Sequence, residues 1–226
     1  MALSHNQESD FDRAYKAENR AYVPWATVVV IAINVIVFAA EYLGPTSMYR
    51  LIASQALSSN VAATGAWYTL LTSMFIHGSI THILCNMVTL YWIGMLLERI
   101  YGSVRFTVLY FVAGIVGGLV FAGIDSALGI RSSAVGASGA IYGLFAAYAY
   151  LLIRESKQAV LFTTRVSRAD VMSFLSVIGI NVLVSLTPGI AWEAHLGGFI
   201  GGLVCGIVLY DTERRAVMKA LRNGMM

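Results

Sequence analysis

The stretch Gly136-Ala137-Ser138-Gly139-Ala140-Ile141-Tyr142-Gly143 places a serine at the start of an apolar helix and surrounds it with glycines. Small residues recur at every fourth position from Gly139 onward, so one face of the predicted helix is nearly bare. A bare face allows a second helix to approach closely. We expect that neighbour to carry His195, because Gly198 and Gly202 follow it at i+3 and i+7 and share its face.

The composition of the 226-residue chain is typical of a membrane protein, with 58% hydrophobic and only 12% charged residues. So few polar residues cannot cover the surface of a soluble domain. The net charge of +3 is modest, and the basic residues fall in loops and tails, which favours membrane orientation over nucleic-acid binding. Cys85 and Cys205 lie in separate apolar runs and are expected to be packed, reduced thiols.

Six apolar runs are candidate membrane-spanning helices. They are residues 25–43, 81–97, 106–124, 138–153, 171–186 and 192–210. We therefore expect an all-α membrane protein, with a six-helix domain at 21–212 between a polar tail at 1–20 and a basic tail at 213–226. The polar tail shows no signal peptide, and no internal repeat is visible, which disfavours a transporter built from inverted halves.

The segment 44–80, between the first two spans, carries little charge. Its apolar side chains recur at helical spacing, namely Trp67, Leu70, Leu71, Met74 and Phe75. This stripe is typical of a short amphipathic helix in the membrane interface. A loop packed on its own protein explains it equally well.

The distribution of basic residues predicts the orientation. Thirteen of the fifteen Lys and Arg residues fall in the two tails and in the loops 98–105 and 154–170. Only Arg50 and Arg131 fall on the opposite side. By the positive-inside rule both termini are cytoplasmic, and we expect a multi-pass protein of the cell's inner (plasma) membrane.

Three polar side chains fall at one predicted depth. His82, Ser138 and His195 each lie sixteen residues before a charged residue that marks the inner end of a span. At 1.5 Å per residue they sit roughly 24 Å above that end, a few ångströms below the outer surface of a core about 30 Å thick. Asn86 lies one turn below His82 on the same face. Polar groups at this depth usually face a bundle interior or a water-filled cavity.

The candidate chemistry follows from these groups. A serine hydroxyl is a weak nucleophile that needs an adjacent base, and a neutral imidazole can take its proton and later give it to a leaving amine. The Ser138 amide, Asn86 and His82 are candidate donors to an oxyanion. No carboxylate lies at this level inside a span, and Glu193 is nearer the outer surface, so the sequence predicts a Ser138–His195 dyad, not a triad. Tyr142 is a candidate to stack on the imidazole.

These features resemble the rhomboid family of intramembrane serine proteases, in its six-span bacterial form. The resemblance covers nearly the whole chain, from the first span to the last. The motifs are Gly136-Ala137-Ser138-Gly139, Ala194-His195-Leu196-Gly197-Gly198, the group His77, His82 and Asn86, and the group Gly94, Glu98, Arg99 and Gly102.

The resemblance implies a six-helix rhomboid bundle with 44–80 as a membrane-embedded first loop. It implies that the fifth span and the loop 187–191 form a lateral gate and cap. The implied substrates are single-span membrane proteins, cut near the outer membrane face after a small residue. The expected partners are these substrates and the lipid bilayer, with no cofactor, no metal and no nucleic acid.

The resemblance also implies roles for individual residues. The nucleophile is Ser138 and the general base His195. The implied oxyanion and substrate-binding groups are His82, Asn86, Gly136 and the Ser138 backbone. The supporting residues are Tyr142, Gly198, Gly202 and His77, of which His77 occupies a mainly structural position.

Alternatives remain for most of these features taken singly. A serine between glycines is usually a packing device, a buried tyrosine is usually core, and Glu98 with Arg99 suits an ion pair or a helix-end anchor. A channel or transporter also places polar groups in a cavity but needs a polar path to both sides. A non-catalytic rhomboid relative generally lacks the serine or the histidine. A lipase-type nucleophile elbow needs a preceding strand, and none is readable.

Overall fold

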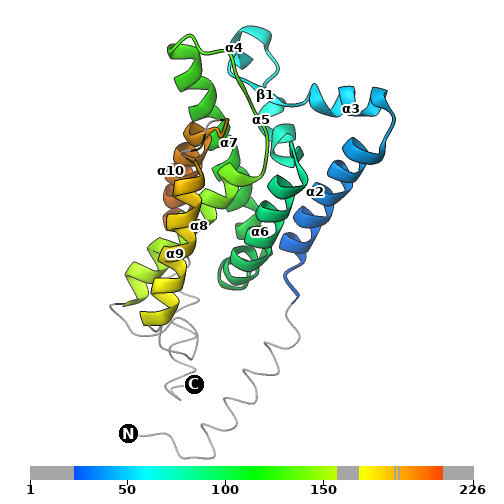
Figure 1. Cartoon of the computed structure of the whole chain (residues 1–226). Helices are drawn as coiled ribbons and strands as arrows, with labels where there is room; N and C mark the ends of the chain where they lie inside the picture. The colour runs from blue at the N-terminus through cyan, green and yellow to red at the C-terminus, as the bar shows by residue number, and fades with distance from the viewer. Residues whose placement is uncertain (1–22, 157–167, 186, 188, 211–226) are drawn as a thin grey trace, which may run out of the picture.

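The computed structural model describes residues 23–156, 168–185, 187 and 189–210. The two tails expected at 1–20 and 213–226, and most of the basic loop 154–170, lie outside the described residues. The main helices are α2 (Trp25–Leu43), α6 (Ile80–Tyr101), α7 (Ser103–Ala127), α8 (Ser138–Ser156), α9 (Arg168–Ser185) and α10 (Trp192–Leu209). Figure 1 shows them running roughly side by side, with α2 next to α6 at one edge.

The remaining elements gather at one end of this bundle (Figure 1). They are α3 (Thr46–Ala53), β1 (Leu57–Ser58), α4 (Val61–Thr64), α5 (Thr69–Thr72), the 3-10 helix η1 (Ser73–Phe75) and β2 (Ser133–Ala134). The two short strands pair antiparallel, which ties the segment 44–80 to the segment before α8. The sequence analysis missed this pairing because two-residue strands carry no period-2 pattern.

Four of the six main helices are long and apolar enough to cross a membrane: α2, α6, α7 and α10. The apolar parts of α8 and α9, Ser138–Ile153 and Val171–Ser185, are shorter. In α8 every residue from 139 to 148 is buried, so this helix is enclosed by the bundle and needs no long lipid-facing surface. The helical membrane bundle is as predicted, whereas six full spans remain a prediction.

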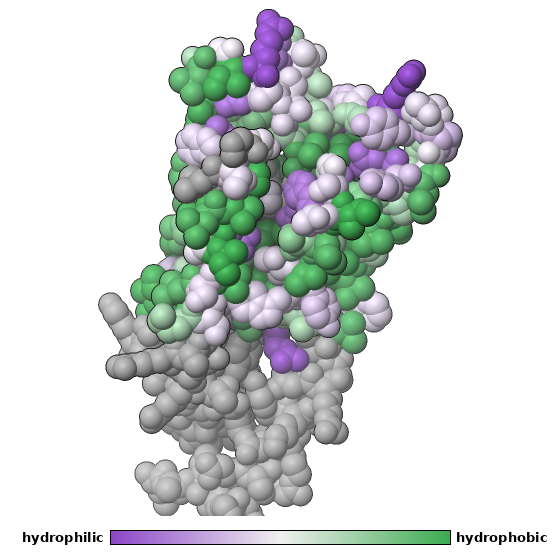
Figure 2. Space-filling view, in the orientation of Figure 1, coloured by the Kyte–Doolittle hydropathy of each residue, from purple (hydrophilic) through white to green (hydrophobic). Residues whose placement is uncertain are grey.

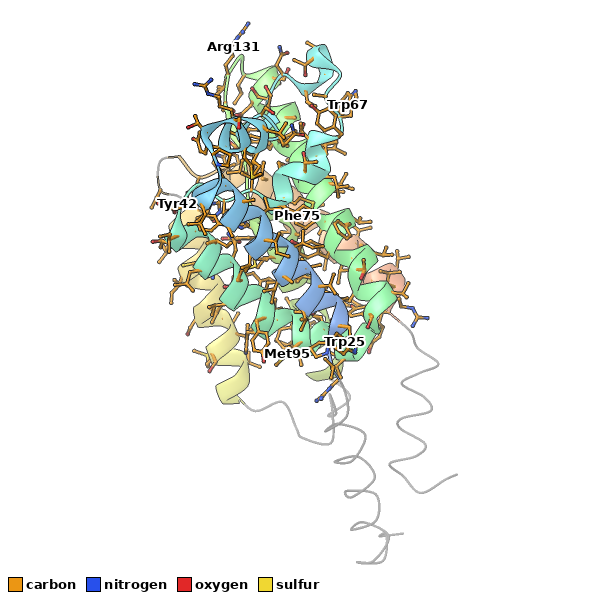
Figure 3. The ribbon with its side chains drawn as sticks, turned by 90° about the vertical axis from the view of Figure 1, so that its right-hand side faces the viewer. Trp25, Tyr42, Trp67, Phe75, Met95 and Arg131 are labelled. Carbon is orange, nitrogen blue, oxygen red and sulfur yellow. The ribbon has the colours of Figure 1, made fainter. Side chains whose placement is uncertain are left out.

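The outer surface of the bundle is apolar. Figure 2 shows hydrophobic side chains along the flanks of the helices and hydrophilic ones gathered at the upper end, around α3 and α4. Figure 3 places Trp25 and Met95 near one end of the bundle and Trp67 and Arg131 near the other. Apolar flanks below a polar end are the pattern expected where a helix bundle leaves one face of a bilayer.

The glycines of α10 bring α8 against it. A Cβ added at Gly198 would collide with the backbone of Gly139, and one added at Gly202 would collide with the backbone of Gly143. The two helices therefore touch through their main chains, which fixes their separation and register. These are the two glycine-lined faces that the sequence analysis expected to meet.

A second glycine pair on α10 faces the other neighbour, α7. A Cβ added at Gly201 would lie 2.7 Å from Cβ of Val116, and one added at Gly197 would lie 2.7 Å from Cγ2 of Val120. The run Gly197-Gly198-Phe199-Ile200-Gly201-Gly202 thus serves two helices at once, because adjacent residues on a helix point about 100° apart. The result is a tightly packed set of α7, α10 and α8.

The segment 44–80 has features of both predicted forms, a short amphipathic helix in the membrane interface and a loop packed on the protein. Short helices are present, and Met74 is only 3% exposed because it packs against Gly114 of α7. Trp67 and Leu71 are 48% and 44% exposed. Phe75 lies beside Phe111 of α7, with the ring centroids 6.3 Å apart, and Figure 3 shows Trp67 farther out. One face of the stripe packs on the protein while the other is free to face lipid.

A buried carboxylate at the other end of the bundle holds α2 in place. Glu98 is fully buried and accepts hydrogen bonds from the backbone N–H groups of Ala26 and Thr27, at 3.0 and 2.8 Å. It also accepts from the hydroxyls of Thr27 and Ser103, at 2.7 and 2.6 Å. Because α2 has no side-chain N-cap of its own, Glu98 supplies the cap from α6. Of the two roles predicted for this residue, the structure gives it that of an anchor.

Helix α9 is the least enclosed main helix. Between residues 171 and 185 only Phe174 and Ser185 are buried. The Phe174 ring lies edge-on to Tyr148, with centroids 4.7 Å apart, and also contacts Phe145 and Trp92. Phe174 and Ser185 are its two buried residues, one near each end, and Val177 and Ile178 between them are partly buried against the core.

The prediction that both cysteines are packed is wrong for Cys85. This thiol is exposed on α6, on the same outward surface as Leu84 and Val88, which are 60% and 62% exposed. Cys205 is half-buried, and both thiols are free. Lipid-facing and core-facing positions are equally apolar, so the sequence pattern could not separate them.

Candidate active site

The loop before α8 is shaped by Gly136. This residue has a φ of +115°, which favours glycine, and its N–H donates to the carbonyl of Ser73 at 2.9 Å. A Cβ added there would lie 2.7 Å from the ring of His82. Glycine is therefore required twice, once by the backbone and once by the neighbouring imidazole. The loop delivers Ser138 as the first residue of α8, where it is half-buried.

The structure brings Ser138 and His195 together. The distance from Ser138 Oγ to His195 Nε2 is 2.8 Å, a hydrogen bond between residues 57 positions apart on α8 and α10. His195 is 8% exposed. Tyr142, one turn below Ser138, lies flat on the imidazole with centroids 4.2 Å apart and planes within 5°. The nucleophile–base hydrogen bond and the stack together have the geometry required for base-activated attack by a hydroxyl.

The second ring nitrogen of His195 has a partner that the sequence analysis missed. His195 Nδ1 is 2.7 Å from the Oγ of Ser185, at the end of α9. Ser185 Oγ is also 2.5 Å from the hydroxyl of Tyr142. A usable signal was present: Ser185 lies seventeen residues after Arg168, so counting depth along the fifth span places it roughly 25 Å from the inner end. The predicted dyad excluded a carboxylate as the third group but not a hydroxyl.

His82 and Asn86 lie on α6 across from the serine. Asn86 is buried and its Nδ2 donates to the backbone carbonyl of His82 at 3.0 Å, which uses one of its two N–H donors. A point at the missing Cβ of Gly136 is 2.7 Å from the His82 ring and 3.9 Å from Asn86 Nδ2. These groups therefore surround one small space beside the loop that carries Ser138.

The start of α8 adds to this donor set. The amide of Ser138 belongs to the first turn, whose N–H groups have no partner within the helix. The helix macrodipole places partial positive charge at the same end. When Ser138 Oγ attacks a carbonyl carbon, the negative charge that develops on the carbonyl oxygen would be stabilised by this amide, by the helix dipole and by the polar hydrogens of α6.

His77 lies behind His82 and not in the site itself. It is 1% exposed, and its ring meets the His82 ring edge-on with centroids 4.9 Å apart. Burial lowers the pKa of His77, so the ring is neutral. His77 therefore packs against His82 and restricts the position of its ring.

No carboxylate among the described residues is hydrogen-bonded to the His195 imidazole. Both nitrogens of His195 are occupied by serine hydroxyls. Glu193 is buried in the first turn of α10, two residues earlier in the chain. Within the described parts of the chain, no three His, Cys, Asp or Glu side chains lie together as metal ligands would. The arrangement suits nucleophilic catalysis by a serine with a histidine base.

Comparison with known proteins identifies the family of the chain. Residues 64–212 match the profile of the Rhomboid domain. The chain belongs to the rhomboid family. The matched range contains Ser138, His195 and the whole of α10.

Individual relatives of this rhomboid come from bacteria and plants. It is 30% identical to "Rhomboid protease GluP" of Bacillus subtilis over 217 residues, which cover 90% of this chain and 38% of the relative. It is 35% identical to "RHOMBOID-like protein 5" of Arabidopsis thaliana over 168 residues, 74% of this chain and 52% of the relative. It is 29% identical to "Putative rhomboid protease YdcA" of Bacillus subtilis over 154 residues, which cover 68% of this chain and 72% of the relative. The chain thus spans only about two fifths to one half of the first two relatives.

Proposed function

We propose that this rhomboid is an intramembrane serine protease that cleaves transmembrane segments of other membrane proteins near the outer membrane face. The observation that carries the proposal is the 2.8 Å hydrogen bond between Ser138 Oγ and His195 Nε2. Two relatives, GluP and YdcA, bear names that describe them as a rhomboid protease and a putative one. In this topology both termini are cytoplasmic and the site opens to the outside.

The reaction begins with attack of Ser138 Oγ on the scissile carbonyl carbon. His195 Nε2 takes the hydroxyl proton as the new C–O bond forms, and the carbonyl oxygen becomes an oxyanion. The Ser138 amide, the free N–H of Asn86 and the His82 ring donate to that oxyanion. Collapse of the tetrahedral intermediate breaks the C–N bond, and the imidazolium gives its proton to the leaving amine. This leaves an ester of Ser138.

Water completes the cycle. His195 takes a proton from a water molecule, the resulting hydroxide attacks the ester carbon, and the same donors hold the second oxyanion. The ester C–O bond then breaks, and the proton returns from His195 to Ser138 Oγ. The half-buried state of Ser138 and His82 supports access of water and peptide to this end of the bundle.

A channel or transporter is less well supported. Below the dyad, α8 and α10 are joined through the contacts of Gly198 with Gly139 and of Gly202 with Gly143. Residues 139–148 of α8 are buried and mostly apolar. A solute would therefore find no polar route onward from the site to the opposite membrane face.

The test is proteolysis by the purified chain in proteoliposomes that contain a single-span membrane substrate. We expect cleavage by the wild type and a loss of about 10⁴-fold or more in Ser138→Ala and in His195→Ala. Ser176→Ala is the matched control, because Ser176 is exposed on α9 and its hydroxyl donates only to the Met172 carbonyl. Cleavage at the wild-type rate by either dyad variant would refute the assignment.

A further inference from the structure

Ser185 is the only buried polar residue of the described part of α9, from 171 to 185, and it lies in the centre of the site. Its Oγ is within hydrogen-bond distance of three groups. These are the backbone carbonyl of Asn181 at 2.9 Å, the hydroxyl of Tyr142 at 2.5 Å and Nδ1 of His195 at 2.7 Å. Three partners fill the capacity of a hydroxyl, which has one proton to donate and two lone pairs.

The positions of the protons follow from this network. The Asn181 carbonyl can only accept, so the Ser185 proton points to it. The Ser185 oxygen must then accept from both other partners, which makes Tyr142 a donor and places a proton on His195 Nδ1. A neutral imidazole carries one N–H, so Nε2 is left with its lone pair. That lone pair faces Ser138 Oγ at 2.8 Å, ready to take its proton.

We propose that Ser185 is a positioning residue for the catalytic base: its oxygen holds His195 in the Nδ1–H tautomer and in the orientation that aims Nε2 at Ser138. This is the task of the aspartate in Ser-His-Asp sites, performed here by a neutral oxygen from a third helix. The proposal rests on the proposed proteolysis. Because Ser185 is on α9 whereas the dyad is on α8 and α10, the base is held in its reactive form only while the end of α9 stays against the bundle.

The tautomer is measured directly by ¹⁵N NMR of the histidine-labelled full-length protein. The His195 signals are identified by their loss in His195→Ala. In the wild type we expect a protonated Nδ1 and an unprotonated Nε2, and in Ser185→Ala a mixture of both tautomers. Ser185→Thr keeps the hydroxyl and is expected to restore the wild-type spectrum. A residue needed only for folding would leave the tautomer of the folded molecules unchanged.

The reactivity of Ser138 is measured as its rate of labelling by a fluorophosphonate probe, which needs no protein substrate. We expect Ser185→Ala to lower that rate about 10- to 100-fold, the loss that is typical when the partner that orients a metal-bound histidine is removed. Ser185→Thr should recover most of the rate. Ser176→Ala removes a hydroxyl with the same i−4 backbone bond from the exposed face of the same helix and should leave it unchanged.

A protonated Nε2 in the wild type, or, where the wild type labels, an equal labelling rate in Ser185→Ala, would overturn the proposal. If the wild type cleaves substrates and Ser185→Ala cleaves and labels equally well, the positioning role alone is wrong. If the wild type neither labels nor cleaves but the tautomer changes in Ser185→Ala, the proposed proteolysis is wrong and the role of Ser185 in fixing the tautomer stands.

Discussion

Two buried polar clusters, at opposite ends of the bundle, use hydrogen bonds in opposite ways. On α6, His82 and Glu98 are sixteen residues apart, or about 24 Å along the axis. The Glu98 carboxylate is fully buried and accepts four hydrogen bonds from α2 and α7. At the other end, Ser138 and His82 are half-buried, and Asn86 uses one of two N–H donors within the chain.

The difference shows how to separate structural from functional polar groups. A saturated carboxylate has no capacity left for a ligand, and its bonds to two other helices stabilise the fold. A group with an unused donor beside a nucleophile can bind an atom that develops charge only during a reaction. Burial alone does not distinguish the two, because Glu98 and Asn86 are both buried.

Within this contrast, the largest effect is expected at the end of the bundle that carries Ser138, His82 and Asn86. Asn86→Ala should lower the rate of proteolysis by about 10²–10³-fold, the usual loss of one oxyanion donor. Its free energy of unfolding should change little, because the side chain bonds only to the carbonyl of its own helix. The measurements are the cleavage rate in proteoliposomes and the unfolding transition in detergent. A stable variant with an unchanged rate would remove Asn86 from the oxyanion site.

At the end of the bundle that carries Glu98, a substitution should lower stability and leave the cleavage rate unchanged. Glu98→Gln replaces one acceptor oxygen with an NH₂ group that faces donors, so we expect a loss of about 1–3 kcal/mol in the free energy of unfolding. The cleavage rate per folded molecule should stay that of the wild type. An intact stability together with a reduced rate would contradict the contrast between the two clusters.

The smallest effect is expected from Thr27→Val, which keeps the volume but removes one hydroxyl bond to Glu98. The carboxylate retains the Thr27 N–H and its two other donors. We expect a loss of about 1 kcal/mol in the free energy of unfolding, near the mean for one hydrogen bond. A loss as large as that of Glu98→Gln would show that the cluster depends on this hydroxyl and not on its saturation as a whole.

The sequence was most informative where a fixed geometry links residue number to position. A constant rise per residue made the depths of Ser138 and His195 countable, and the glycine spacing indicated which faces meet. In the structure these two side chains are hydrogen-bonded. The helical membrane bundle was predicted from the composition and from the length of the apolar runs.

Other features depend on where separate elements lie, which no local pattern encodes. Glu98 caps α2 only because α6 ends beside the start of α2. Ser185 was missed because only a carboxylate was excluded as the third group, although a hydroxyl can also accept a proton from an imidazole. Cys85 was misplaced because lipid and protein interior select the same apolar residues.

The distance between Phe174 and Ser185 along α9 has a geometric consequence. Phe174 and Ser185 are eleven residues apart, so they are separated by about 16 Å along the helix. A tilt of about 10° around the aromatic contacts of Phe174 would move Ser185 by about 3 Å, which is enough to break a hydrogen bond of ordinary length. A small change in the angle of α9 would thus disconnect the imidazole from Ser185, so the proposed positioning of the base depends on how firmly the last turns of α9 pack against the bundle.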